Sequence, residues 1–269
     1  MSILKRLLDI YIGASLHVAF AVFALVRMTQ HMFAIENHDA MGWFAFFSTV
    51  AGYNFVKYHS LVWQQNWKLT PWTRTVARVS VIAMMLAFYY FWHLSLAARA
   101  VTGLFAVLTV LYALPFFPNR TNARNWAGVK IYIVSICWAG VTVVLPMLDA
   151  GMAFTVELMF KCLQRFILIF VLILIFEIVD LRKDDPLLKT VPQQIGVRRT
   201  KWLGMALLVI FFLLEIMQTQ NPDGQWLANT ILVAVTGAFL AGASEQRSRY
   251  YSALWVEAIP ILWWAMIAC

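Results

Sequence analysis

Long apolar stretches separated by short polar segments run through the whole chain. A helix that crosses a membrane needs about 20 mainly apolar residues. Nine stretches reach or approach that length. The pattern predicts an all-α, polytopic membrane protein with one transmembrane domain over residues 1–269. The nine predicted spans are 9–28, 41–62, 76–94, 98–117, 128–148, 155–179, 202–219, 226–243 and 252–268.

Composition supports a membrane protein. Only 13% of the 269 residues are charged, 62% are hydrophobic, and the mean hydropathy is +0.73. A soluble domain has about 25% charged residues. The lysine and arginine residues form no continuous basic face, so no nucleic-acid partner is expected. The expected partners are membrane lipids, and the sequence does not indicate an oligomeric state.

The basic residues predict an orientation in the membrane. If the N-terminus is cytoplasmic, all but four of the 21 lysine and arginine residues fall in segments on the inner side. This is the asymmetry that the positive-inside rule requires. We therefore expect a multi-pass protein of the bacterial inner membrane with a cytoplasmic N-terminus. The four exceptions are Arg27, Arg99, Lys161 and Arg165.

The most distinctive polar segment follows the sixth apolar stretch and reads FEIVDLRKDDPLLKTVPQQIG. Glu177, Asp180 and Asp184 share one helical face if the helix continues through them. Neighbouring carboxylates repel one another unless a cation separates them, and Mg²⁺ takes oxygen ligands that it shares with phosphates. Lys189 adds positive charge suited to a diphosphate. The alternative is a solvated loop in which acids and bases pair with each other.

This segment resembles the second aspartate-rich motif of the UbiA superfamily of intramembrane prenyltransferases. Asp180 and Asp184 match its D-x-x-x-D pattern, residues 189–192 match its K-T-hydrophobic-P stretch, and Gly196 matches its glycine. Nine helices and a cytoplasmic N-terminus are also similar. The resemblance implies a UbiA-like bundle around a central cavity. It also implies that Mg²⁺ links an isoprenoid diphosphate to catalytic Asp180 and Asp184, with Glu177 as a further metal ligand.

The first aspartate-rich motif of that family is not matched. In YNFVKYHSLVW, Asn54 is present, but Phe55, Tyr58 and Val62 occupy the aspartate positions. Asn54, Lys57 and Tyr58 share one helical face. Lys57 is therefore expected to supply catalytic positive charge in place of a metal, with Asn54 and Tyr58 binding the substrate. Alternatively, Lys57 anchors the helix end and Asn54 joins neighbouring helices.

Further charged residues are candidates for substrate binding. Arg120 and Arg124 lie between the fourth and fifth apolar stretches, and Lys130 lies at the start of the fifth. They are expected to hold diphosphate oxygens or, alternatively, lipid headgroups. Glu257 lies within the last stretch, where a carboxylate is costly unless it is functional or paired with a buried cation such as Arg165.

The expected function is Mg²⁺-dependent transfer of a prenyl group from an isoprenoid diphosphate to an apolar or aromatic acceptor. Because the first-motif carboxylates are missing, two alternatives stay open. One is cyclisation of the diphosphate to a terpene, and the other is binding of a prenyl diphosphate or another lipid without catalysis. A transporter is disfavoured, because transporters often carry internal repeats and none is evident in this chain.

Overall fold

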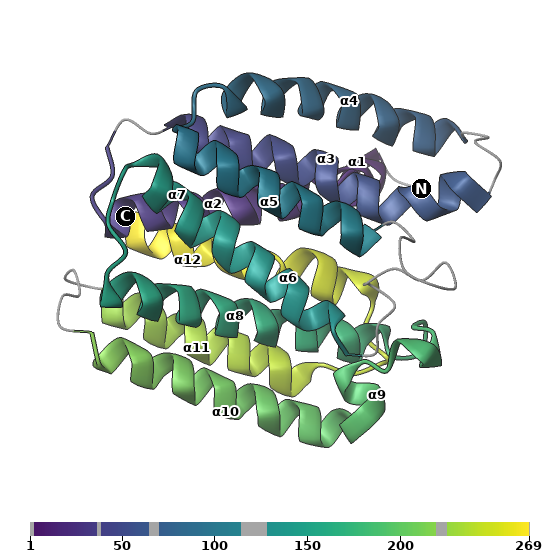
Figure 1. Ribbon diagram of the computed structural model, residues 1–269. Helices are drawn as coiled ribbons and strands as arrows, with labels where there is room; N and C mark the ends of the chain where they lie inside the picture. Colours follow the sequence, from purple (N-terminus) through teal and green to yellow (C-terminus); the bar gives the residue numbers. More distant parts are fainter. Residues whose placement is uncertain (1–2, 37–38, 65–69, 114–127, 219–224, 269) are drawn as a thin grey trace.

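The computed structural model describes residues 3–36, 39–64, 70–113, 128–218 and 225–268. These residues are helical as predicted, and no strand occurs among them. Most of the long helices run along a common direction and form one bundle (Figure 1). The elements are α1 (Ile3–Gly13), α2 (Leu16–Met32), α3 (Asp39–Gln64), α4 (Pro71–Phe91), α5 (Leu96–Ala113), α6 (Lys130–Ala139), η3 (Gly140–Val144), α7 (Leu145–Asp149), α8 (Val156–Asp180), η4 (Pro186–Leu188), α9 (Val191–Ile195), α10 (Val197–Ile216), α11 (Gln225–Gly242), η5 (Tyr251–Val256) and α12 (Ile259–Ala268).

Each of the nine predicted spans coincides with a helix or with a helix interrupted by a break. Among the described residues, five spans are long and apolar enough to cross a membrane: α4, the run Lys130–Asp149, α8, α11 and the run Tyr251–Ala268. The pair α1 and α2 makes a sixth if it counts as one span. The chain therefore has the helices of a membrane protein, whereas the count of nine spans stays a prediction.

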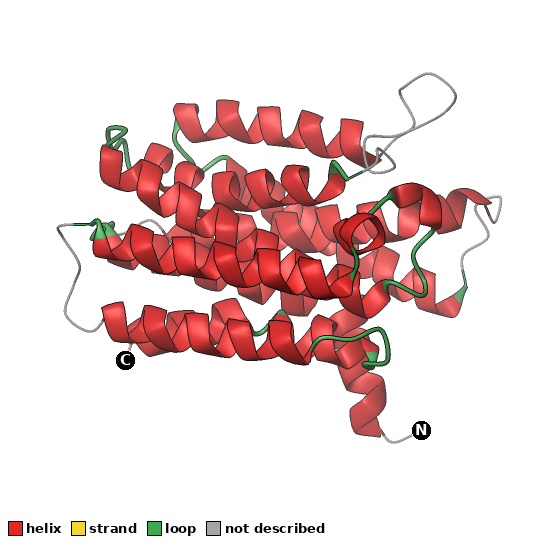
Figure 2. Cartoon of the chain, turned by 90° about the horizontal axis from the view of Figure 1, so that it is seen from below, coloured by secondary structure: helices red, strands yellow, loops and turns green. Residues whose placement is uncertain are grey.

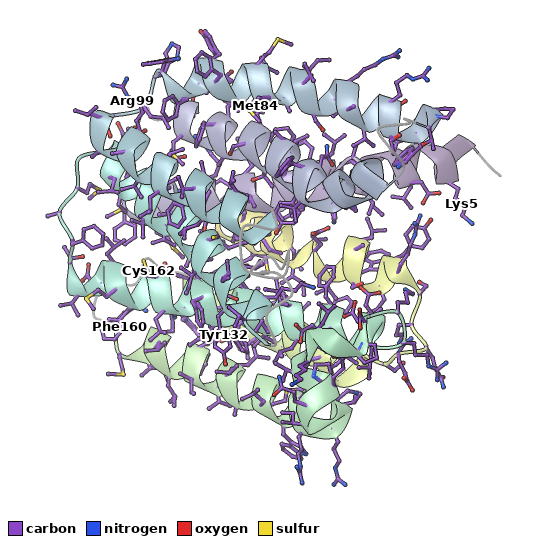
Figure 3. The ribbon with its side chains drawn as sticks, turned by 45° about the vertical axis from the view of Figure 1, so that its right-hand side comes forward. Lys5, Met84, Arg99, Tyr132, Phe160 and Cys162 are labelled. Atoms are coloured by element: carbon purple, nitrogen blue, oxygen red, sulfur yellow. The ribbon has the colours of Figure 1, made fainter. Side chains whose placement is uncertain are left out.

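The outer surface of the bundle carries large apolar side chains. Met84 and Phe88 of α4 are 58% and 61% exposed, and Tyr132 of α6 is 52% exposed. Figure 3 shows Met84 on the outer surface of the molecule. A large apolar surface of this kind is stable against lipid or another apolar partner, which agrees with contact to membrane lipids.

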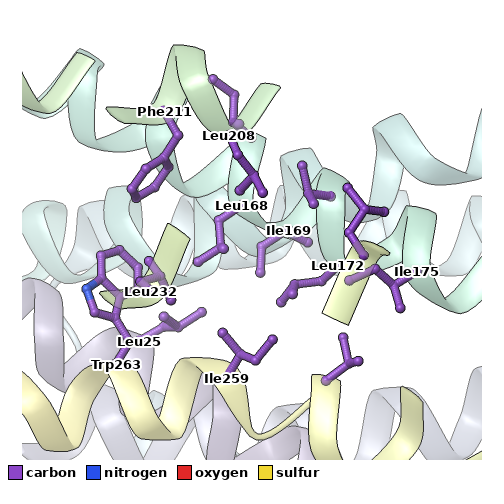
Figure 4. Packing of buried hydrophobic residues seen from close by; sticks show 14 of the residues in the cluster. Leu25, Leu168, Ile169, Leu172, Ile175, Leu208, Phe211, Leu232, Ile259 and Trp263 are labelled. Atoms are coloured by element: carbon purple, nitrogen blue, oxygen red, sulfur yellow. The ribbon is translucent and has the colours of Figure 1, made fainter. Parts of the chain in front are cut away.

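The largest core cluster joins α2, α8, α10, α11 and α12. Figure 4 shows Leu25, Leu168, Phe211 and Trp263 meeting in this cluster, and all four are almost fully buried. α8 lies at its centre because leucine, isoleucine and valine occupy every face of this helix, and a helix that is apolar all round is buried. The core thus fixes the position of the acidic segment that follows α8.

The prediction of one continuous helix over 9–28 is wrong. α1 and α2 meet at 59°, and Figure 2 shows α1 leaving the bundle at an angle. At the break, Ser15 has a left-handed backbone with φ 60°. Two carbonyl groups there accept hydrogen bonds from α3: the Tyr58 hydroxyl donates to Gly13 at 2.8 Å, and the Asn54 amide donates to Ala14 at 3.1 Å. Contacts with α3 therefore stabilise the break.

Candidate functional site

Most of the predicted site residues lie at one end of the bundle, which we call the α9 end. The last turns of α8, the first turns of α6 and α10, and helix α9 lie there, at the lower right of Figure 1, and the last turns of α3 lie at the same end, at the upper right. Polar side chains form two groups at this end. The α8 cluster consists of Lys130, Glu177, Asp180 and Asp184, and the α3 cluster consists of Tyr11, His17, Lys57 and Glu257.

Glu177 is the buried member of the α8 cluster and is 3% exposed. Its carboxylate accepts a hydrogen bond from the backbone N–H of Val191 at 3.0 Å, one of the free donors at the start of α9. Lys130 attracts the Glu177 carboxylate electrostatically and Asp184 repels it. The fold thus brings two predicted metal ligands and one predicted substrate-binding residue within electrostatic reach of one another.

The prediction that Glu177, Asp180 and Asp184 share one helical face is wrong for Asp184, because α8 ends at Asp180. The chain turns at this point, and the backbone N–H groups of Lys183 and Asp184 donate to the Asp180 carbonyl oxygen at 2.7 and 3.0 Å. The Lys183 ammonium also lies 3.1 Å from the Asp180 carboxylate, and both side chains are exposed. Such a pair is what the alternative interpretation of a solvated loop expects.

A neighbouring ion pair joins this turn to the segment after α11. Arg182 donates to Glu245 at 3.1 Å, and both side chains are exposed. The hydrogen bond to Glu245 raises the pKa of Arg182 above its ordinary value. Exposed pairs of this kind contribute little to stability, so this pair adds little to the stability of the turn after α8.

The α8 cluster has the oxygen ligands that Mg²⁺ prefers, although its carboxylates are partly engaged. Glu177 bonds Val191 through one oxygen, and Asp180 is paired with Lys183. In the described ranges, no three histidine, cysteine, aspartate or glutamate side chains lie close enough together to hold a metal ion. A Mg²⁺ ion at this place would require Asp180 to leave Lys183, and the magnesium site stays a prediction.

Lys189, another predicted substrate-binding residue, lies between η4 and α9 in the chain. Lys189 is exposed and has a left-handed backbone with φ 45°, which is uncommon for a residue other than glycine. The Gln194 side chain donates to the Lys189 carbonyl oxygen, which holds this conformation. Arg120 and Arg124 lie outside the described residues, so their predicted role is not placed in space.

Asn54 and Tyr58 take part in helix packing. The Asn54 side chain is 2% exposed, and besides Ala14 it donates to the Ser80 hydroxyl of α4 at 3.0 Å. Tyr58 is occupied by its hydrogen bond to Gly13. These contacts join α3 to α4 and to the break between α1 and α2, as the alternative interpretation of Asn54 expects. Neither side chain has a contact with the α8 cluster among the described residues.

Lys57 faces Glu257, which lies between η5 and α12. The two groups attract each other electrostatically, and Tyr11 also interacts with Glu257. Lys57 is exposed and Glu257 is half-buried. In the described part of the chain, no hydrogen bond or ion pair joins the Lys57 and Glu257 side chains. The alternative that Glu257 pairs with Arg165 is wrong, because Arg165 bonds to neutral groups elsewhere.

His17 connects three segments beside Glu257. Its Nε2 atom lies 2.8 Å from the Leu254 carbonyl oxygen and its Nδ1 atom lies 3.0 Å from the Tyr11 hydroxyl. A carbonyl oxygen can only accept, so Nε2 carries a proton, and Nδ1 of the neutral ring accepts from Tyr11. This chain of hydrogen bonds fixes α1 and α2 against η5 and positions Tyr11 near Glu257.

The sequence identified Lys57 and Glu257 separately, and their separation of 200 residues gives no local signal that they meet. Tyr11 and His17 were not recognised as site residues, because single polar residues in an apolar stretch carry no motif.

Comparison of the chain with family models, with curated proteins and with solved structures gives no match. The resemblance to the UbiA superfamily therefore stays an interpretation of the segment from Asp180 to Gly196.

Proposed function

We propose that the protein is a Mg²⁺-dependent membrane enzyme that binds an isoprenoid diphosphate at the α9 end and transfers its prenyl group to an apolar or aromatic acceptor. One observation carries this proposal. Glu177, Asp184 and Lys130 come from three different segments and interact electrostatically at the end of a membrane bundle. Carboxylates beside an ammonium are the combination that holds a diphosphate through a shared cation.

Bound Mg²⁺ supplies positive charge that neutralises phosphate oxygens and a diphosphate leaving group. Asp180 and Asp184 would hold the ion, together with Glu177 from the buried side. Lys130 and Lys189 would meet the remaining phosphate oxygens as point charges. The apolar helices around the site would keep the prenyl chain in lipid and would keep water away from the reacting carbon.

The ion pair between Lys183 and Asp180 has a place in this proposal. It neutralises the Asp180 carboxylate while the site is empty of ligand, and both side chains are exposed enough to separate. On binding, the Lys183 ammonium would move to a phosphate oxygen. Lys57 is left out of the diphosphate site, because its electrostatic partners are Glu257 and Arg249 and do not include the α8 cluster.

A second candidate function is binding of the same lipid without catalysis. The Lys183–Asp180 ion pair favours it, because this pair occupies a carboxylate that catalysis needs for Mg²⁺. The end of α3 also lacks the carboxylates of a second metal site, since Phe55, Tyr58 and Val62 stand at the corresponding positions. Binding and catalysis are separated by measuring them independently.

Binding is tested by isothermal titration calorimetry of the purified protein in detergent with farnesyl thiodiphosphate, a ligand that resists cleavage. We expect binding with Mg²⁺ and its loss in EDTA. Asp184→Asn and Lys130→Met should each weaken binding by about tenfold or more, which corresponds to about 1.4 kcal/mol. The matched control is Asp39→Asn, an exposed carboxylate at the start of α3, which should leave affinity unchanged. Equal binding with and without Mg²⁺ contradicts the proposal.

A further inference from the structure

The α3 cluster contains two opposite charges that are held apart. The Lys57 ammonium and the Glu257 carboxyl attract each other, but neither has a hydrogen bond or an ion pair within the described residues. Glu257 is half-buried in an apolar span, where a carboxyl group is costly unless it is paired. A third polar group that contacts both Lys57 and Glu257 would give each of them a partner.

An apolar groove begins beside this cluster. Its volume is about 370 Å³, and it lies between the first two helices and α12. Tyr11 belongs both to the groove and to the α3 cluster, and Ile261 lies one turn after Glu257. α2 and α12 belong to apolar spans, so the groove is suited to a lipid chain. Its lining residues are Tyr11, Phe20, Phe23, Ala24, Ile261 and Trp264.

We propose that the α3 cluster and this groove bind an aminophospholipid such as phosphatidylethanolamine. The lipid phosphate meets Lys57, its ammonium meets Glu257, and one acyl chain lies in the groove. Charge complementarity selects this occupant, because the headgroup carries one anion and one cation, which match Lys57 and Glu257. An anionic headgroup with no cation would be repelled by Glu257, and a choline group has no N–H to donate to it.

The neighbouring contacts hold the site in shape. α1 is also fastened at Asp9, which accepts a hydrogen bond from the Tyr250 hydroxyl at 2.6 Å and forms an ion pair with Arg249. Arg249 also acts electrostatically on Lys57, so a second cation stands near the proposed phosphate position. The backbone N–H of Glu257 bonds the Ser252 carbonyl oxygen at 3.1 Å, which fixes the start of the Glu257 side chain at the end of η5.

The test is native mass spectrometry of the detergent-purified protein with phosphatidylethanolamine, phosphatidylcholine and phosphatidylglycerol of identical acyl chains. Wild type should prefer phosphatidylethanolamine by about fivefold or more, a difference of about 1 kcal/mol. Lys57→Gln and Glu257→Gln should each abolish this preference. The double variant Lys57→Glu/Glu257→Lys should restore it, because the two charges exchange places. Soluble O-phosphoethanolamine should bind much more weakly, since it has no chain for the groove.

Matched controls come from exposed charges outside the cluster. Arg198→Gln and Glu245→Gln, both on the surface, should keep the lipid preference. Asp184→Asn should also keep it while losing farnesyl thiodiphosphate, so this site and the proposed diphosphate site fail independently. Equal binding of the three lipids by wild type overturns the proposal even if a variant fails to fold. A preference that persists in Lys57→Gln overturns it as well.

Discussion

The guanidinium carbon of Arg165 lies 5.2 Å from the centroid of the Trp263 ring in the middle of the bundle. The same guanidinium donates to the Leu25 carbonyl oxygen at 3.2 Å and to the Thr142 hydroxyl at 3.4 Å. Among the described residues, none of its hydrogen-bond partners is a carboxylate. The buried Arg165 of α8 therefore joins three other elements. It bonds a carbonyl group of α2 and a hydroxyl group of η3, and it lies over an aromatic ring of α12.

Arg165→Lys should destabilise the protein. A lysine cannot donate to Leu25 and Thr142 together while lying flat on Trp263, and we expect a loss of about 2–3 kcal/mol in the free energy of unfolding. Thermal unfolding in detergent, followed by tryptophan fluorescence, should show a lower midpoint. Arg198→Lys on the surface of α10 is the matched control and should leave the midpoint unchanged. A midpoint equal to wild type in Arg165→Lys would show that these contacts do not stabilise the bundle.

Glu215 is the centre of a second buried polar network, at the end of the bundle opposite α9. It lies 3.3 Å from the Lys161 ammonium and accepts hydrogen bonds from Gln164 at 2.9 Å and Gln225 at 2.8 Å. Glu215→Leu leaves Lys161 without its counterion, and we expect a cost of about 3–5 kcal/mol. Denaturant unfolding measures this cost.

The double variant Glu215→Leu/Lys161→Met separates the charge from the rest of the network. It should recover part of the lost stability, because the uncompensated buried ammonium is gone. Two results would contradict this account. One is a free energy of unfolding for Glu215→Leu equal to that of wild type. The other is a double variant whose loss is the sum of the losses of the two single variants.

Gly140 at the start of η3 allows a close approach to α5. A Cβ atom at this position would lie 2.0 Å from Cζ of the Phe105 ring. We expect Gly140→Ala to cost about 1–3 kcal/mol by overpacking, and Phe105→Leu in the same chain should relieve part of it. Gly52→Ala is the matched control, since among the described residues no atom outside its own stretch of helix lies within 4 Å of its added Cβ. The midpoints of thermal unfolding of these variants test whether α5 packs this closely on Gly140. Equal midpoints for the two alanine variants would contradict it.

The helices could be predicted because each is marked by its own apolar run, independently of the others. The break between α1 and α2 could not, because part of its cause is remote in sequence. The donors that satisfy the Gly13 and Ala14 carbonyls come from Tyr58 and Asn54, about 40 residues away. The end of α8 at Asp180 was likewise missed, because an acidic segment alone does not show where backbone hydrogen bonds change from helix to turn.

The candidate site was predictable only in part, because some of its residues interact with residues that are remote in sequence. Glu177 and Lys130 stood out as charges next to apolar runs, and the structure places them within electrostatic reach of each other. The partner of Glu257 could not be found in this way. Arg165 and Lys57 are both cations in apolar helices, and only the tertiary structure shows that Lys57 is the one within electrostatic reach of Glu257.

Prenyl transfer is tested most directly by the release of diphosphate. Purified protein is incubated with Mg²⁺, a membrane lipid extract that supplies apolar and aromatic acceptors, and radiolabelled geranyl, farnesyl or geranylgeranyl diphosphate, and released diphosphate is measured over time. We predict Mg²⁺-dependent release with at least one of the three. Asp180→Asn and Asp184→Asn should each slow it by about tenfold or more, equivalent to about 1.4 kcal/mol of transition-state stabilisation, and Asp39→Asn should leave it unchanged. No release from any of the three, or release that survives both aspartate substitutions, would contradict a prenyltransferase.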